Sequence, residues 1–138
     1  MVFKNGIDAG VDFIMVSHLS VPAITDTTPE DDVQDNIPCS LSSVVVTDIL
    51  REELGYDGIV ITDAMNMEAI STYYGADEAA ILALKAGCDM ILMPEDFELA
   101  YQGVLAAVQN GTISEERIND SLRRIYRIKY ADKLEITE

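Results

Sequence analysis

The chain has 138 residues, 49% of them hydrophobic, and a formal net charge of −16. This length is enough for one compact domain, and so acidic a chain argues against binding to nucleic acids or anionic membranes, which attract basic surfaces. The apolar runs are short and interrupted, so no segment is expected to cross a membrane, and the first residues are not expected to act as a signal peptide.

Three short apolar runs stand out along the chain, at 13–16, 59–61 and 90–93. Each is bounded by glycine or aspartate, which is typical of strands buried on both faces of a parallel sheet. Segments with helical periodicity fill the gaps between them. Helices are predicted to end near residue 9, and to run from Ser40 or Ser42 to about Leu54, from 65 to 74, from 78 to 86 after a cap at Asp77, from 97 to 110, and from Ser114 onward.

The order of these elements predicts the fold class. Strands that alternate with helices form parallel sheets with right-handed crossovers, and a faint internal repeat (9–15 and 86–92) is typical of βα units. A full (β/α)8 barrel takes about 250 residues, so three strands are too few to close one. We therefore predict an α/β fold, a partial TIM barrel of about three parallel β/α units with an extra C-terminal helix. Residues 1–138 would form a single domain cut from a larger protein.

The sequence offers no pattern for a metal ion or a cofactor. Cys39 and Cys88 have no further Cys or His at ligand spacing, and Cys88 is predicted to be a buried thiol at the start of an apolar run. The acidic segment 26–35 lacks the glycine of a calcium-binding loop and is predicted to be a solvated loop. The glycines form no G-x-G-x-x-G phosphate-binding pattern. We therefore expect neither a metal nor a cofactor.

The C-terminal ends of parallel strands build the active sites of α/β enzymes, and Asp63 follows the second predicted strand directly. Its carboxylate could attack an anomeric carbon, bind a metal or cap the helix predicted after it. Position alone does not separate the nucleophile from the helix cap.

The other two predicted strands also end in polar residues. His18, the single histidine, follows the first strand, and a lone histidine forms neither a metal site nor a triad. We assign it a structural or substrate-contacting role in preference to a catalytic one. Glu95 and Asp96 follow the third strand and are expected to begin the next helix. Met65 and Met67 are interpreted as packing residues, not as cofactor contacts.

The segment LREELGYDGIVITDAMNM, residues 50–67, closely resembles the signature region of family 3 glycoside hydrolases. In that family an Arg-x-x-Leu-Gly-aromatic-x-Gly segment leads into the strand whose terminal Asp is the nucleophile. Residues 12–18, 38–42 and 83–94 resemble the preceding strand, the loop into the next helix and the last barrel strand. The similarity is collinear and covers roughly residues 3–130.

The resemblance implies that Asp63 is the nucleophile of a retaining glycosidase. The continuation from Ala64 to Met67 resembles the β-N-acetylhexosaminidase branch, whereas the β-glucosidase branch typically has a Trp after the nucleophile and this chain has none. The implied substrate is a glycan with terminal β-N-acetylglucosamine. His18 and Met65 are the expected substrate-binding residues beside Asp63.

The same resemblance implies that the acid/base group that works with Asp63 is missing from this chain. In the hexosaminidase branch a His–Asp pair on an earlier loop is the acid/base, preceded by a Lys-His motif, and this chain contains neither pattern. We therefore expect the chain alone to have negligible glycosidase activity, and its exposed sheet edges to drive self-association. The competing hypothesis is a non-catalytic α/β binding or regulatory module in which Asp63 caps a helix.

Overall fold

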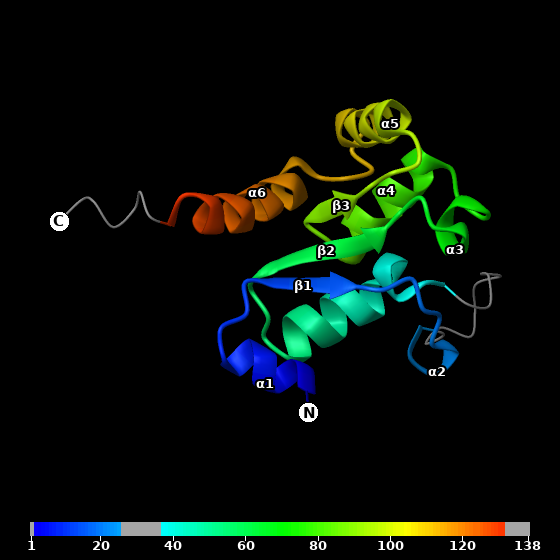
Figure 1. Ribbon diagram of the computed structural model, residues 1–138. Helices are drawn as coiled ribbons and strands as arrows, with labels where there is room; N and C mark the ends of the chain where they lie inside the picture. Colours follow the sequence, from blue (N-terminus) through cyan, green and yellow to red (C-terminus); the bar gives the residue numbers. More distant parts are fainter. Residues whose placement is uncertain (1, 26–36, 132–138) are drawn as a thin grey trace.

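The computed structural model describes residues 2–25 and 37–131. A parallel sheet with the strand order β1-β2-β3 lies at its centre (Figure 1) and is formed by β1 (Phe13–Val16), β2 (Ile59–Ala64) and β3 (Met90–Leu92). Ile14 lies opposite Val60 in the β1–β2 register. The predicted parallel α/β sheet is therefore confirmed, with β2 longer than expected and β3 one residue shorter.

Helices of several lengths surround the sheet. Those of the described residues are, in chain order, α1 (Val2–Asp8), α2 (Pro22–Thr25), the 3₁₀ turn η1 (Cys39–Leu41), the π-helix η2 (Val44–Glu53), α3 (Glu68–Ser71), α4 (Ala76–Ala86), α5 (Phe97–Gln109) and α6 (Glu115–Lys129). Figure 1 shows α1 and the teal η2 on one side of β1, α5 against α4, and α6 extending toward the C-terminus. The chain thus alternates strands and helices as its sequence predicts.

The helix predicted at 65–74 is much shorter in the structure. β2 continues through Ala64, because the Met65 amide donates a hydrogen bond of 2.8 Å to the Leu92 carbonyl of β3. The helix α3 begins only at Glu68 and its N-cap is Met67. Asp63 therefore does not cap a helix, and the interpretation of Asp63 as a helix cap is wrong.

Two further helix predictions need correction. The stretch from Ser40 to Leu54 divides into η1 and η2, and the Leu54 amide bonds to the Ile49 carbonyl five residues earlier. Sequence signals for helix starts and stops do not distinguish these hydrogen-bond registers. Asp77 lies in the first turn of α4 and is not its cap, since the N-cap is Gly75. A carboxylate in the first turn still stabilises the helix, because the helix N-terminus carries a partial positive charge.

The predicted starts of the last two helices are confirmed. The Asp96 side chain accepts a hydrogen bond of 3.0 Å from the Leu99 amide at the start of α5. Ser114 does the same for the Arg117 amide, at 3.1 Å, at the start of α6. Both side chains satisfy amides that a helix N-terminus leaves unpaired.

The core lies between the sheet and the helices η2 and α4. Val46, Val60, Ala83 and Cys88 have no exposed surface at its centre. The predicted burial of Cys88 is confirmed, and desolvation raises the pKa of its thiol to about 12. Burial of this aliphatic cluster is the main force that holds η2 and α4 against the sheet.

Among the described residues, no helix combines the length and apolar character needed to cross a bilayer. The acidic loop predicted at 26–35 lies outside the described residues.

Candidate active site

Asp63 lies near the C-terminal end of β2 and is partly buried. Its Oδ1 atom accepts a hydrogen bond of 2.8 Å from the amide of the next residue, Ala64. This contact fixes one carboxylate oxygen against the backbone. A carboxylate held at this edge of a parallel sheet is placed where βα enzymes bind their substrates.

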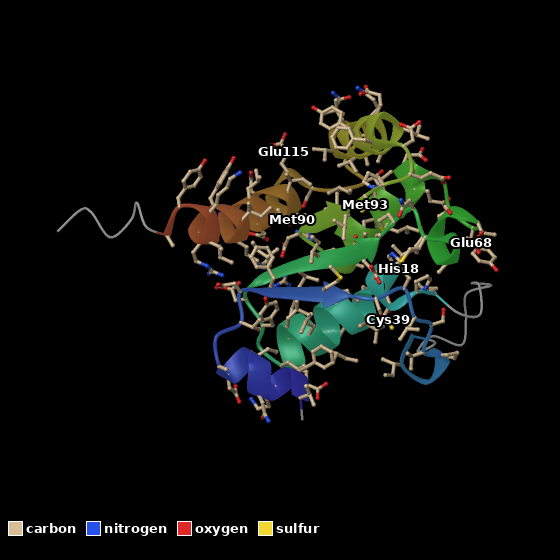
Figure 2. The ribbon with its side chains drawn as sticks, viewed as in Figure 1. His18, Cys39, Glu68, Met90, Met93 and Glu115 are labelled. Atoms are coloured by element: carbon tan, nitrogen blue, oxygen red, sulfur yellow. The ribbon has the colours of Figure 1, made fainter. Side chains whose placement is uncertain are left out.

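His18 lies beyond the end of β1 and only 7% of its surface is exposed. Its Nδ1 atom is 2.7 Å from the Ser40 hydroxyl, and its Nε2 atom is 3.0 Å from the Ala64 carbonyl oxygen. Figure 2 shows His18 near Cys39 at the end of the sheet toward which the strands point. The structure thus brings His18 to the backbone beside Asp63, as their shared sheet edge predicts.

Met65 lies in the core, with 3% of its surface exposed. Its amide bonds to Leu92 of β3, and the Leu92 amide in turn donates 3.0 Å to the Thr62 hydroxyl. Burial makes Met65 a packing residue in this structure. Met67, its neighbour in the sequence, is 44% exposed and does not share that packing.

Two features of this edge were not found by sequence reasoning. Met93 follows β3 with a φ of 46°, a left-handed conformation that is uncommon for a residue other than glycine, and it is exposed. Ser40 was predicted only as a possible start of a helix, but its fully buried hydroxyl contacts His18. No sequence signal marks either feature, and the contact of Ser40 with His18 joins residues that are 22 positions apart.

Glu95 is exposed and belongs to a shallow groove with Tyr73 and Tyr74 between α3 and the start of α5. The groove lies beside the same sheet edge. In residues 2–25 and 37–131, no group of three or more His, Cys, Asp or Glu side chains could hold a metal ion.

A buried charge cluster occupies the opposite end of the sheet. Asp89 precedes β3, its side chain has no exposed surface, and its carboxylate accepts hydrogen bonds from Arg51 at 2.5 Å and Arg124 at 3.1 Å. The Ser121 hydroxyl and the Val60 amide add bonds of 2.7 and 3.0 Å. Residues at the N-terminal face of a parallel barrel serve stability, so we place Asp89 outside the active site.

The chain is a parallel βα segment with a carboxylate at a strand end, an arrangement found in βα enzymes. The family model for the glycosyl hydrolase family 3 N terminal domain matches residues 1–128. The chain therefore belongs to glycoside hydrolase family 3.

Individual proteins of known sequence or structure are also similar to this chain. A β-N-acetylglucosaminidase of this family from Paenibacillus sp. str. FPU-7 superposes with a TM-score of 0.84 at 40% identity, over 99% of this chain and 25% of that one. A β-hexosaminidase from Vibrio cholerae is 40% identical over 102 residues, or 73% of this chain and 28% of that protein. A β-N-acetylglucosaminidase/β-glucosidase from Cellulomonas fimi is 28% identical over 130 residues, or 94% of this chain and 23% of that protein. The chain thus spans about a quarter of the length of these relatives.

Proposed function

We propose that this chain supplies the nucleophile, Asp63, of a retaining glycosidase that removes terminal β-N-acetylglucosamine. The observation that carries the proposal is the position of Asp63, partly buried at the C-terminal end of β2 with Oδ1 held by the Ala64 amide. The names of the Paenibacillus and Vibrio relatives support the substrate class.

The proposed chemistry takes two displacements. A carboxylate oxygen of Asp63 attacks the anomeric carbon, the bond to the leaving oxygen breaks, and an acid group protonates that oxygen. Water then attacks the anomeric carbon of the glycosyl-aspartate ester and gives a proton to the same group, now acting as a base. The sugar is released with retained configuration and the Asp63 carboxylate is restored.

The choice of sugar rests on the residues after the nucleophile. Asp63 is followed by Ala64 and the buried Met65, which resembles the hexosaminidase branch, in place of the Trp typical of the β-glucosidase branch. The name of the Cellulomonas relative includes both activities, so β-glucosides are the competing substrates to include in an assay. Direct sugar contacts by His18 and Met65 stay predictions.

The acid that protonates the leaving oxygen would come from outside this chain, because no residues match the family's His–Asp and Lys-His motifs. We therefore expect residues 1–138 alone to show negligible turnover of an aryl N-acetyl-β-glucosaminide. Clear turnover that is lost in Asp63→Ala would contradict this part of the proposal. In the same view, residues 1–138 form the nucleophile-bearing part of a larger barrel.

A chimera tests the nucleophile directly. Residues 1–138 would replace the matching quarter of the Paenibacillus enzyme, which supplies the remaining barrel. We expect the chimera to hydrolyse the aryl N-acetyl-β-glucosaminide and Asp63→Ala to reduce kcat by a factor of about 10⁴ or more. Asp12→Ala is the matched control, since Asp12 is an exposed aspartate beside the opposite end of the sheet. Equal losses of kcat in the two variants would contradict the assignment of Asp63 as the nucleophile.

Self-association is the second part of the proposal. β1 and β3 are the outer strands of the sheet, and Phe13 and Met15 of β1 are 46% and 53% exposed. Unpaired strand edges beside exposed apolar side chains favour pairing between chains. We expect concentration-dependent dimers or larger species in sedimentation velocity, and a strictly monomeric profile over a wide concentration range would contradict this.

A further inference from the structure

His18 joins two segments of the candidate active site that lie far apart in the sequence. Its Nδ1 atom lies 2.7 Å from the Ser40 hydroxyl and its Nε2 atom lies 3.0 Å from the Ala64 carbonyl oxygen. Ser40 has no exposed surface and His18 is 7% exposed. In this buried setting the ring cannot turn without leaving polar atoms unpaired, which is costly.

The partners of the ring fix its tautomer. A carbonyl oxygen only accepts hydrogen bonds, so Nε2 must carry the proton that is donated to Ala64. In the neutral ring Nδ1 is then an acceptor and receives the hydroxyl proton of Ser40. Ser40 thus donates to His18, and His18 donates to the backbone at Ala64.

The peptide group between Ala64 and Met65 is held from both neighbouring strands. Its carbonyl accepts from His18, beyond β1, and its amide donates 2.8 Å to the Leu92 carbonyl of β3. One residue earlier, the Ala64 amide donates to Oδ1 of Asp63. The orientation of the Asp63 carboxylate therefore depends on backbone atoms of a residue that His18 holds in place.

We propose that His18 is a positioning residue that orients the Asp63 carboxylate through the Ala64 backbone, with Ser40 fixing the ring. The inference rests on the proposed role of Asp63 as the nucleophile. A nucleophile must approach the anomeric carbon at a set distance and angle, and a displacement of about 1 Å can reduce a rate about 100-fold. In this role the His18 ring acts through the backbone and does not need to touch the sugar.

The single histidine makes the ring directly observable in the 138-residue chain. In a sample labelled with nitrogen-15 histidine, at a pH where the ring is neutral, we expect a protonated Nε2 and an unprotonated Nδ1. Ser40→Ala should shift the Nδ1 resonance, while Ser43→Ala, at an exposed serine three residues on, should leave it unchanged. A proton on Nδ1, or averaging between the two tautomers, would overturn the proposal.

Two substitutions of His18 separate the proposed contact from the volume of the side chain. In His18→Gln the side-chain amide nitrogen can reach the place of Nε2 and donate to Ala64, whereas the shorter side chain in His18→Asn reaches only the place of Nδ1. Hydrogen exchange of the Met65 amide reports how firmly the peptide is held. We expect its protection to fall about tenfold in His18→Asn and to be retained in His18→Gln. Equal protection in both variants refutes the positioning role.

Kinetics of the chimera carry the same comparison to catalysis. We expect His18→Asn to reduce kcat about 100-fold with little change in KM, and His18→Gln to recover most of that loss. If Asp63→Ala abolishes turnover but His18→Asn does not change kcat, the positioning inference fails and the nucleophile stands. If Asp63→Ala retains turnover, the proposed function fails, whatever the ring nitrogens show.

Discussion

Replacing Asp89 by alanine tests how the fold supports the site. The Asp89 side chain is fully buried and joins η2, β2 and α6 through Arg51, Val60, Ser121 and Arg124. In Asp89→Ala the side chains of Arg51, Arg117 and Arg124, which are only 10%, 21% and 22% exposed, lose this carboxylate. Arg124 keeps its ion pair with Asp57. Removing one partner of a buried ion pair leaves the other charge without compensation.

The contacts of Arg51 and Val60 set how much stability Asp89→Ala should lose. Breaking a buried ion pair from one side costs about 3–5 kcal/mol. Arg51 keeps hydrogen bonds to the carbonyls of Tyr56, Gly58 and Gly87, which favours the lower end of that range. The unpaired Val60 amide adds about 1 kcal/mol. We therefore expect a loss of about 4 kcal/mol, which is a large part of the roughly 5–15 kcal/mol that stabilises an ordinary domain.

Urea denaturation followed by far-UV circular dichroism measures this loss. With a slope of about 2 kcal/mol per molar urea, the midpoint should fall by about 2 M, or the variant should be unfolded without urea. The matched control is Asp120→Ala on α6, because the side chains of Asp120 and its partner Arg123 are 44% and 63% exposed. Loss of such a solvent-accessible ion pair should shift the midpoint little. If the two variants have the same midpoint, the reasoning about the Asp89 cluster is wrong.

Desolvation raises the pKa of Cys88 to about 12, so the folded state holds the thiol proton more tightly than the unfolded state does. The free energy of unfolding should therefore be highest below about pH 9 and should fall as the pH rises toward 12. Cys88→Ala should show a smaller fall. Gly87→Ala should destabilise more than Gly55→Ala in thermal unfolding: both glycines have positive φ, but a Cβ at Gly87 would lie 2.7 Å from the Thr47 hydroxyl, whereas one at Gly55 meets nothing within 4 Å. Met93→Gly should leave the melting temperature unchanged or raise it, because glycine removes the cost of a φ of 46° at an exposed side chain, and a clear fall would show that Met93 packs against something needed for stability.

The strands and most helix ends could be predicted because their signals are local. The runs Phe13–Val16 and Met90–Leu92 are apolar and preceded by aspartate, and each is a strand in the structure. Asp96 and Ser114 cap helices, as short polar residues before a helical pattern commonly do. The end of β2 could not be predicted in this way, because its last pairing is to Leu92, nearly thirty residues later.

The position of Asp63 near the C-terminal end of a strand could be predicted from the sequence, but the residues around it could not. His18 contacts Ser40, which lies 22 residues later in the chain, and Ala64, which lies 46 residues later. No local pattern encodes these contacts. The Asp89 cluster was missed for the same reason. Its one sequence signal is the aspartate repeated before β1 and β3, and the exposed Asp12 shows that the repeat alone does not create such a cluster.

Trapping of the covalent intermediate is the most direct measurement of the nucleophile. The chimera with the Paenibacillus enzyme would be treated with a 5-fluoro glycosyl fluoride of N-acetylglucosamine, whose good leaving group permits the first displacement while the ring fluorine slows the second. Peptide mass spectrometry should then find the fluorosugar esterified to Asp63, with no label in Asp63→Ala. A label on any other residue, or unchanged labelling of Asp63→Ala, would contradict the assignment of Asp63 as the nucleophile.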